Sequence, residues 1–247
     1  MEHNGSRIGV GITTRDRPEV LEYTLRQFDR YTPTEIRIVV IDDNSSDPNP
    51  NELATEPYGE YYFNEVRLGV AKSKNECIKK LTKCTHIFLF DDDCFPICDE
   101  WWKPWLVGEH HMVFSPGKGV RKVKSKSIEM EGGLGCCLYF SRHCLDVVGG
   151  FDPDFGMWGY EHAELTNRIY CAGLTSYTYI APLTPNVFSF DYSGDHGDIN
   201  GDGFKWIHRG CMTQEEKGEC ELINRAPFHK AIAKMRSGDV KRDIWRS

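Results

Sequence analysis

The chain has 247 residues, a length that allows one large α/β domain or two small ones. Its hydrophobic share of 40% and charged share of 27% are ordinary for a soluble globular protein. The formal net charge of −7 argues against general attraction to nucleic acid or to an anionic membrane, although it leaves room for a local basic face.

Neither a leader peptide nor a membrane anchor is expected. The first seven residues are polar, the apolar run at 8–12 is too short for a signal peptide, and no run is long enough to span a bilayer. The ten cysteines include no CxxC pair, so zinc binding has little support and most are expected to be buried thiols. These features predict a cytoplasmic protein.

The first hundred residues alternate between short apolar strands and helices. Pro18 suits the first turn of a helix, and Leu21, Leu25 and Phe28 follow at helical spacing. We expect strands at residues 8–12, 36–41, 61–66 and 87–90, and helices at 18–31 and 69–81. This alternation with short loops predicts an α/β fold with a mostly parallel sheet and right-handed crossovers.

The second half of the chain is less regular. We expect strands at 112–115, 132–140 and 175–180, helices at 142–148 and 161–172, a basic loop at 118–127, and irregular structure at 191–203. Trp101, Trp102 and Trp105 cluster after the last strand of the first half. Together with Trp158 they form either a sugar-stacking wall or a hydrophobic core under the loop, and the core is the interpretation we favour for most of the four.

Three consecutive carboxylates, Asp91, Asp92 and Asp93, follow the apolar strand at 87–90. Burying three anions together without compensation is costly, so they are expected at the mouth of the strand, facing something positive. Ligands of open α/β sheets bind outside the carboxyl ends of the strands. Hard oxygen ligands suit Mg²⁺ or Mn²⁺ bound to a diphosphate. The competing interpretation is a solvated acidic turn.

Two other strand ends carry groups that suit a nucleotide. Thr13 and Arg15 follow the first strand, with Arg17 close behind, while Asp42 and Asp43 follow the second. A carboxylate there accepts hydrogen bonds from a uracil amide or from ribose hydroxyls, and arginines neutralise phosphates. Each residue alone is more often an ordinary loop charge. Three such strand ends on one rim favour a binding site.

These motifs, in this order, resemble the nucleotide-sugar glycosyltransferases of the Rossmann-like GT-A type, especially family 2. The resemblance covers about residues 8–200 and rests on TTRDRP at 13–18, VIDDNSSD at 40–47, RLGVA at 67–71 with Asn75, DDD at 91–93, GGFD at 149–152, and WGYEHAEL at 158–165 with Arg168. It implies a GT-A domain at 1–210, with a nucleotide-binding half at 1–100 and a smaller acceptor and metal half at 101–210. A basic extension at 211–247 follows.

The resemblance also implies roles for individual residues in binding a UDP-sugar. Asp43 or Asp42 would contact the base, with Thr13 and Arg15 nearby, and Asp91 would face the ribose. The rest of the implied donor site is Arg67, Asp92 and Trp158.

The acidic triplet corresponds to the metal-binding DXD motif of such enzymes. Asp93 would hold Mn²⁺ or Mg²⁺, which bridges the diphosphate and offsets charge on the leaving UDP. A histidine often completes the metal shell in relatives. His196 is the expected ligand and His208 the alternative.

The segment that begins at Trp158 would supply the catalytic base. Inverting transfer needs one carboxylate to take the proton of the acceptor hydroxyl. Relatives usually carry Glu-Asp here, whereas this chain has Glu161 and His162. Either residue is therefore a candidate base. We expect transfer with inversion of the anomeric centre. Because retaining relatives also lack this Asp, transfer with retention stays open.

Two basic segments stand out in an acidic chain. Residues 118–126 carry five positive charges and no negative ones, and residues 225–247 are also basic. They are solvated faces, or else they form a track for a polyanionic acceptor. The expected acceptor is therefore a glycan or DNA with hydroxymethylated bases. Some phage-encoded glycosyltransferases modify such DNA in the host cytoplasm. Phosphate contacts would bind the DNA, and the target base must be flipped out of the duplex.

Two other functions stay open. His162 in place of the usual Asp allows a non-catalytic module that binds a nucleotide-sugar or nucleic acid. A nucleotidyltransferase also uses clustered carboxylates with metals, but the first strand is not followed by the glycine-rich phosphate loop typical of sugar nucleotidyltransferases.

Overall fold

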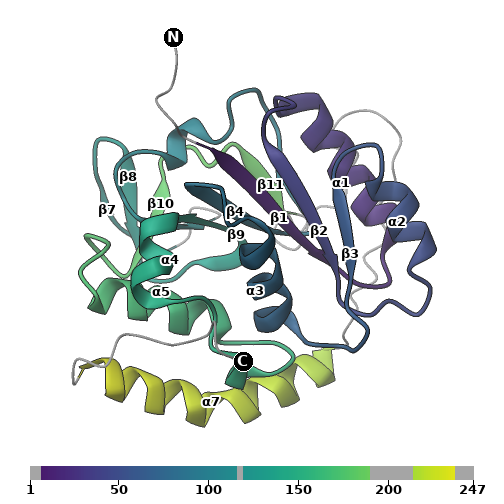
Figure 1. Cartoon of the computed structure of the whole chain (residues 1–247). Coiled ribbons are helices and arrows are strands. Elements are labelled where there is room, and N and C mark those ends of the chain that lie inside the picture. Colours follow the sequence, from purple (N-terminus) through teal and green to yellow (C-terminus); the bar gives the residue numbers. More distant parts are fainter. Residues whose placement is uncertain (1–6, 116–118, 190–213, 237–247) are drawn as a thin grey trace.

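A computed structural model describes residues 7–115, 119–189 and 214–236 (Figure 1). The first half contains β1 (Ile8–Thr14), α1 (Pro18–Tyr31), β2 (Arg37–Asp42), α2 (Asn49–Thr55), β3 (Glu60–Phe63), α3 (Val70–Lys80), β4 (His86–Asp91) and β5 (Cys94–Pro96). The second half contains β6 (His111–Phe114), β7 (Val120–Val123), β8 (Ser127–Met130), β9 (Leu134–Ser141), α4 (Arg142–Val148), α5 (Glu161–Cys171), β10 (Tyr179–Pro182), β11 (Val187–Ser189) and α7 (Gln214–Arg236). Short 3₁₀ turns lie at η1 (Lys103–Trp105) and η2 (Pro153–Phe155).

The central sheet has six strands in the order β3-β2-β1-β4-β9-β6. The first four are parallel, and β9 and β6 extend the sheet in antiparallel pairing. The predicted mostly parallel sheet is confirmed. Because β1 lies between β2 and β4, the ends of these three strands are neighbours, with Thr13 paired to Ile41 on one side and Asp91 on the other.

Both faces of this sheet are buried, as expected for strands with continuous apolar runs. On β4, Phe88 and Phe90 belong to one hydrophobic cluster with α1, whereas Ile87 and Leu89 belong to a second cluster with α3, α4 and α5. The predicted helix at 18–31 is confirmed, with Leu21, Leu25 and Phe28 completely buried. Two helical layers therefore enclose the sheet (Figure 1).

The tryptophan cluster is largely core. Trp101 and Trp105 are completely buried beside Phe88, with Trp101 stacked edge-on to it at 4.8 Å between ring centroids. The indole nitrogens donate to the Thr32 hydroxyl at 3.0 Å and to the Pro185 carbonyl at 2.8 Å. The favoured interpretation of these residues as core is therefore confirmed for Trp101 and Trp105.

The expected basic loop at 118–127 was wrong. Residues 120–130 form a β7–β8 hairpin, which joins β10 in a three-stranded sheet. Strand β7 has no buried face, since all four of its residues are exposed at the edge of this sheet, so hydrophobic periodicity could not reveal it. The expected strand at 175–180 also begins later than predicted, at Tyr179.

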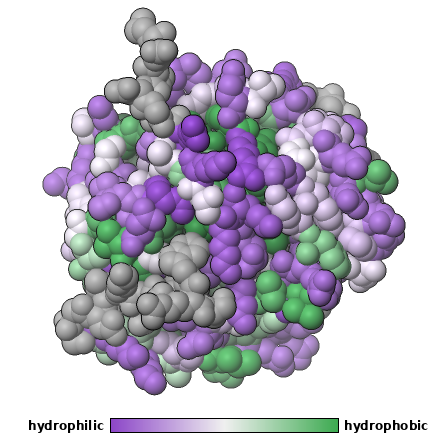
Figure 2. All heavy atoms as spheres, in the orientation of Figure 1, coloured by the Kyte–Doolittle hydropathy of each residue, from purple (hydrophilic) through white to green (hydrophobic). Residues whose placement is uncertain are grey.

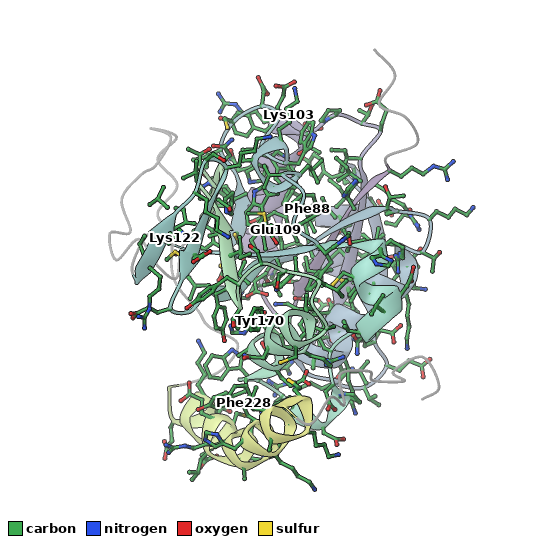
Figure 3. All side chains as sticks on the ribbon, turned by 90° about the vertical axis from the view of Figure 1, so that its left-hand side faces the viewer. Phe88, Lys103, Glu109, Lys122, Tyr170 and Phe228 are labelled. Atoms are coloured by element: carbon green, nitrogen blue, oxygen red, sulfur yellow. The ribbon has the colours of Figure 1, made fainter. Side chains whose placement is uncertain are left out.

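The C-terminal helix α7 packs against α5 and η2. Figure 3 labels Phe228 on α7, beneath the helix that carries Tyr170. Among the described residues, no helix combines the length and the apolarity that crossing a bilayer requires. The irregular segment predicted at 191–203 lies outside the described residues.

Candidate active site

A cleft of ≈ 550 Å³ opens at the carboxyl ends of β1 and β4. Its walls include these strand ends, the start of α3, the glycine-rich segment Gly132–Cys136, the loop Met157–Tyr160 with the start of α5, and part of α7. Figure 2 shows the face of the molecule that is seen in Figure 1 as mostly hydrophilic, with hydrophobic residues in separate patches.

Most of the residues that the sequence singled out meet in this cleft. Its lining includes Thr13, Arg15, Asp43, Arg67, Asp91, Asp92, Asp93, Trp158, Glu161 and His162. Asp42 does not line it. His196 and its alternative His208 lie outside the described residues, so their predicted role as metal ligands stays a prediction.

Arg17 compensates two of the three clustered carboxylates. Its guanidinium pairs with Asp92 and lies 2.9 Å from Asp93 Oδ2. Burial alone would lower the pKa of Arg17, but the charges of the two aspartates raise it well above its ordinary value. Asp92 also accepts a hydrogen bond from the Thr14 hydroxyl at 2.6 Å. Asp92 therefore ties the β4 end to the β1 loop.

The third carboxylate, Asp91, is the most open of the triplet. Its side chain is 38% exposed, and its Oδ1 lies 2.9 Å from Nζ of Lys74 on α3, a lysine whose own side chain is 1% exposed. Lys74 also donates to the Gly135 carbonyl at 2.7 Å. Sequence reasoning missed Lys74, although its signal was available. It stands four residues after Val70, on the inner face of the predicted helix, where an unpaired charge is unfavourable.

Asp42 and Asp43 serve different sides of the β2 end. Asp42 is completely buried and accepts from the Asn51 amide and the Tyr61 hydroxyl, each at 2.7 Å, and from the Ser45 backbone. Its placement gives no support to a nucleotide contact. Asp43 lines the cleft and accepts from the backbone nitrogens of Leu68 at 2.7 Å and Gly69 at 2.9 Å. It therefore fixes the turn into α3.

Glu161 is the first residue of α5 and is 5% exposed. Its Oε1 lies 3.5 Å from Nδ1 of His162, while its Oε2 is buried without a hydrogen-bond partner. Burial by itself raises the pKa of Glu161. The hydrogen bond and charge of His162, with the charge of Lys74, outweigh burial and lower that pKa to about 2. Glu161 is thus an anion at neutral pH.

His162 links α5 to the glycine-rich wall. Its Nε2 lies 3.2 Å from the Gly133 carbonyl, which accepts from it. A Cβ on Gly135 would lie 3.0 Å from His162 Nδ1, so a glycine at that position leaves room for the imidazole ring. His162 therefore holds the wall and Glu161 together.

The cleft suits a divalent cation that arrives with a diphosphate. The described residues contain no cluster of three or more His, Cys, Asp or Glu arranged for a metal ion. Mg²⁺ and Mn²⁺ are nevertheless commonly held by one or two carboxylates together with substrate phosphates. Asp91 and Asp93, which both line the cleft, supply such carboxylates.

Two protein-family models match the chain. "Glycosyl transferase family 2" matches residues 10–106, and "N-terminal domain of galactosyltransferase" matches residues 119–191. An uncharacterized glycosyltransferase of Acanthamoeba polyphaga mimivirus is 25% identical over 223 residues, which cover 79% of this chain and 83% of the relative.

Solved structures share the fold. GalNAc-T7 with UDP, GalNAc and Mn²⁺ matches 75% of this chain and 44% of its own, with a TM-score of 0.63 and 18% identity. The mannosyltransferase PcManGT from Pyrobaculum calidifontis, with GDP-Man and Mn²⁺, matches 70% of this chain and 54% of its own, with a TM-score of 0.57 and 19% identity. TarS from S. aureus with UDP matches 67% of this chain and 55% of its own, with a TM-score of 0.52 and 14% identity.

The chain therefore spans about half the length of these solved structures. The fold and the family matches agree. The sheet has an antiparallel extension and a cleft at its strand ends, and the two family models match adjoining parts of the chain. The chain therefore has the GT-A fold, and both of the family models that match successive parts of it are glycosyltransferase models.

Proposed function

We propose that this chain is a metal-dependent enzyme that moves a sugar from a UDP-sugar to a hydroxyl acceptor. One observation carries the proposal: Glu161, a buried carboxylate with one unpartnered oxygen, lines the same cleft as Asp91 and Asp93. A buried polar atom without a partner is rare in native proteins and needs an explanation. A hydroxyl of a bound substrate is the partner we assign to it.

The donor occupies the strand-end side of the cleft in this proposal. Asp43 and Thr13 face the nucleotide base, with Arg15 beside them, and Asp91 faces the ribose. Arg67 supports a phosphate site, because its Nε is buried without a partner and a guanidinium donates strongly to phosphate oxygens. The solved structures named with UDP, GDP-Man and Mn²⁺ support a nucleotide-sugar donor.

A divalent cation, held by Asp93 with His196 as a further proposed ligand, supplies Lewis-acid stabilisation of the charge on the leaving diphosphate. Arg17 assists from the protein side, because it pairs with both Asp92 and Asp93 and holds the two carboxylates in place. Asp91 stays paired with Lys74, which limits the negative charge that meets the phosphates.

Glu161 acts on the acceptor. Its anionic carboxylate accepts a hydrogen bond from the acceptor hydroxyl and aligns that oxygen for attack on the anomeric carbon. The hydroxyl becomes strongly acidic as the new bond forms, so even a carboxylate of low pKa receives its proton. Attack from the side opposite UDP inverts the anomeric centre. His162 fixes the carboxylate from its other side.

The acceptor we propose is a glycan or a polyanion such as hydroxymethylated DNA. The β7–β8 hairpin supports the polyanion, because it runs directly into the cleft wall at Gly132 and carries Lys122 and Lys126, both exposed. Its charge is partly offset, since Arg121 pairs with Glu131 and Lys124 with Glu129. Figure 3 places Lys122 at the outer edge of the molecule.

The proposed activity is tested by incubating the protein with UDP-sugars and Mn²⁺ and measuring released UDP. Asp93→Ala and Glu161→Gln are expected to abolish turnover, while Glu109→Gln, at a partly exposed side chain outside the cleft, serves as a matched control. Turnover that survives both substitutions would refute the assignment. Mass spectrometry of hydroxymethylated DNA and of free glycans, treated with the enzyme and UDP-hexoses, then identifies which acceptor gains one hexose.

A non-catalytic nucleotide-binding module is the alternative. It is motivated by His162 where relatives usually carry Asp. UDP binding without turnover across donors and acceptors would favour it.

A further inference from the structure

Helix α7 contributes to the cleft from outside both matched family segments, 10–106 and 119–191. Lys217 and Glu221, on its N-terminal half, line the cleft. The Lys217 ammonium lies 5.5 Å from the centre of the Trp158 ring. This element therefore touches the loop that leads into Glu161, although it lies outside both family-model matches.

The loop before α5 has an unusual backbone. Gly156, Gly159 and Tyr160 all have positive φ, at 62°, 94° and 68°. Tyr160 is not a glycine, and a left-handed conformation costs free energy for such a residue. Carbonyls of this loop face α7, and buried acceptors need donors. The next residue in the chain is Glu161.

Asn224 on α7 supplies those donors. Its side chain is 2% exposed, and its amide nitrogen donates to the carbonyls of Phe155, Trp158 and Gly159, the last two at 2.8 and 3.0 Å. One buried amide thus holds three carbonyls spread over five residues of the loop. In the described part of α7, its other buried side chains, Ala231 and Met235, lie further along the helix and are apolar.

A second contact acts on the same loop from one helical turn further along α7. The ring of Phe228 lies 4.9 Å from the ring of Tyr160, measured between centroids. Phe228 follows Asn224 by four residues, so both side chains project from the same face of the helix. Together the two side chains contact the segment 155–160, which contains the left-handed residues.

We infer that Asn224 is a positioning residue for Glu161, and that α7 is thereby part of the catalytic machinery rather than an appendage. The inference rests on the proposed role of Glu161 toward the acceptor. Asn224 is not itself a cleft-lining residue, but its side chain holds the backbone of Trp158 and Gly159, which line the cleft and lead into Glu161. Donor contacts at the ends of β1, β2 and β4 are independent of it.

The test compares Asn224→Ala with Ile223→Ala, an adjacent substitution at a side chain that is 70% exposed. Hydrogen–deuterium exchange followed by mass spectrometry reports the backbone of residues 155–165 without requiring any activity. We expect exchange there to be at least tenfold faster in Asn224→Ala than in wild type, with the peptides of β1 and β4 unchanged. Ile223→Ala should match wild type everywhere.

Kinetics provide the second readout. Asn224→Ala is expected to lower kcat for sugar transfer at least tenfold while KM for the UDP-sugar changes less than twofold, because the proposed donor contacts at Asp43, Asp91 and Asp93 lie at strand ends that Asn224 does not contact. Phe228→Leu keeps an apolar side chain but removes the ring contact. It should also lower kcat with little change in KM, but the fall in kcat should be smaller than in Asn224→Ala. If Asn224→Ala fails to fold, Phe228→Leu carries both readouts.

The outcomes separate this inference from the proposed function. Unchanged exchange at 155–165 in a folded Asn224→Ala overturns the inference, whether or not the wild type turns over a UDP-sugar. An equal rise in KM and fall in kcat, or exchange that rises across the whole sheet, also overturns it, because the role would then be merely structural. Inactive wild type with locally increased exchange would contradict the proposed function alone.

Discussion

Lys74 Nζ and Asp91 Oδ1 lie 2.9 Å apart, and the pair joins a lysine that is almost fully buried to a carboxylate that opens into the cleft. Desolvation by itself lowers the pKa of Lys74, yet Asp91 and Glu161 raise it above its ordinary value. A buried cation beside two anions in a cleft is the kind of perturbed group that clusters at functional sites. Lys74 therefore offsets the negative charges of Asp91 and Glu161.

Replacing Lys74 changes the pH at which Glu161 loses its charge. The Lys74 charge is one of the causes that lower the pKa of Glu161 to about 2. Lys74→Met is therefore expected to raise that pKa by about one unit or more. The acid limb of the pH–rate profile should move upward by the same amount. The exposed Lys72→Met on the same helix is the control. An unmoved limb contradicts the coupling between the two residues.

Arg17 holds the acidic strand end together. Its side chain is 11% exposed, and the carboxylates that it contacts are 5% and 6% exposed. Breaking such a buried pair leaves uncompensated charge, so Arg17→Met should lower the free energy of unfolding by about 3 kcal/mol. Urea denaturation measures this. Arg26→Met, at a side chain that is 63% exposed on α1, should change stability by less than about 0.5 kcal/mol. Equal effects of the two substitutions would refute the assignment.

His111 makes stability depend on pH. Burial lowers the pKa of this ring to about 4, against a hydrogen bond to the Tyr139 carbonyl that raises it. The unfolded chain, with a histidine pKa of about 6.5, therefore binds the proton more readily than the folded one between those values. Stability is present above about pH 6.5 and is lost as the pH falls toward 4. Between pH 7 and 5 the loss is about 2 kcal/mol.

Urea unfolding at pH 7 and pH 5 checks this. His111→Gln should reduce the difference in the free energy of unfolding between pH 7 and pH 5. His143→Gln, at an exposed histidine, should leave that difference unchanged. A His111→Gln protein that still loses about 2 kcal/mol on acidification would show that another group is responsible.

The sequence predicted the parts of the fold where burial repeats regularly. Strand β4 carries an unbroken apolar run because both of its faces meet helices, and its boundaries were found within one residue. Strand β7 was missed because an exposed edge strand has no apolar face. Helix α7 was missed for a related reason, since its buried side chains are few and include Asn224 rather than an apolar stripe.

The location of the site could be predicted from the sequence, but the orientation and pairing of its side chains could not. Three strand ends that share a rim follow from chain order alone, so the cleft at Asp91–Asp93 was foreseeable. Which of Asp42 and Asp43 faces the cleft was not, because adjacent residues past a strand point to opposite sides and either orientation fits the sequence. The pairing of Lys74 with Asp91 joins residues on different elements, and only the packing of α3 on the sheet brings them together.

The most direct measurement is calorimetric titration of the protein with UDP, with and without Mn²⁺. A cleft in which Asp93 holds a cation that binds the diphosphate of UDP predicts binding at least tenfold tighter with Mn²⁺, an advantage that Asp93→Asn removes and Glu109→Gln retains. UDP affinity that is the same with and without Mn²⁺, or the same in Asp93→Asn as in wild type, would contradict the assignment of this cleft.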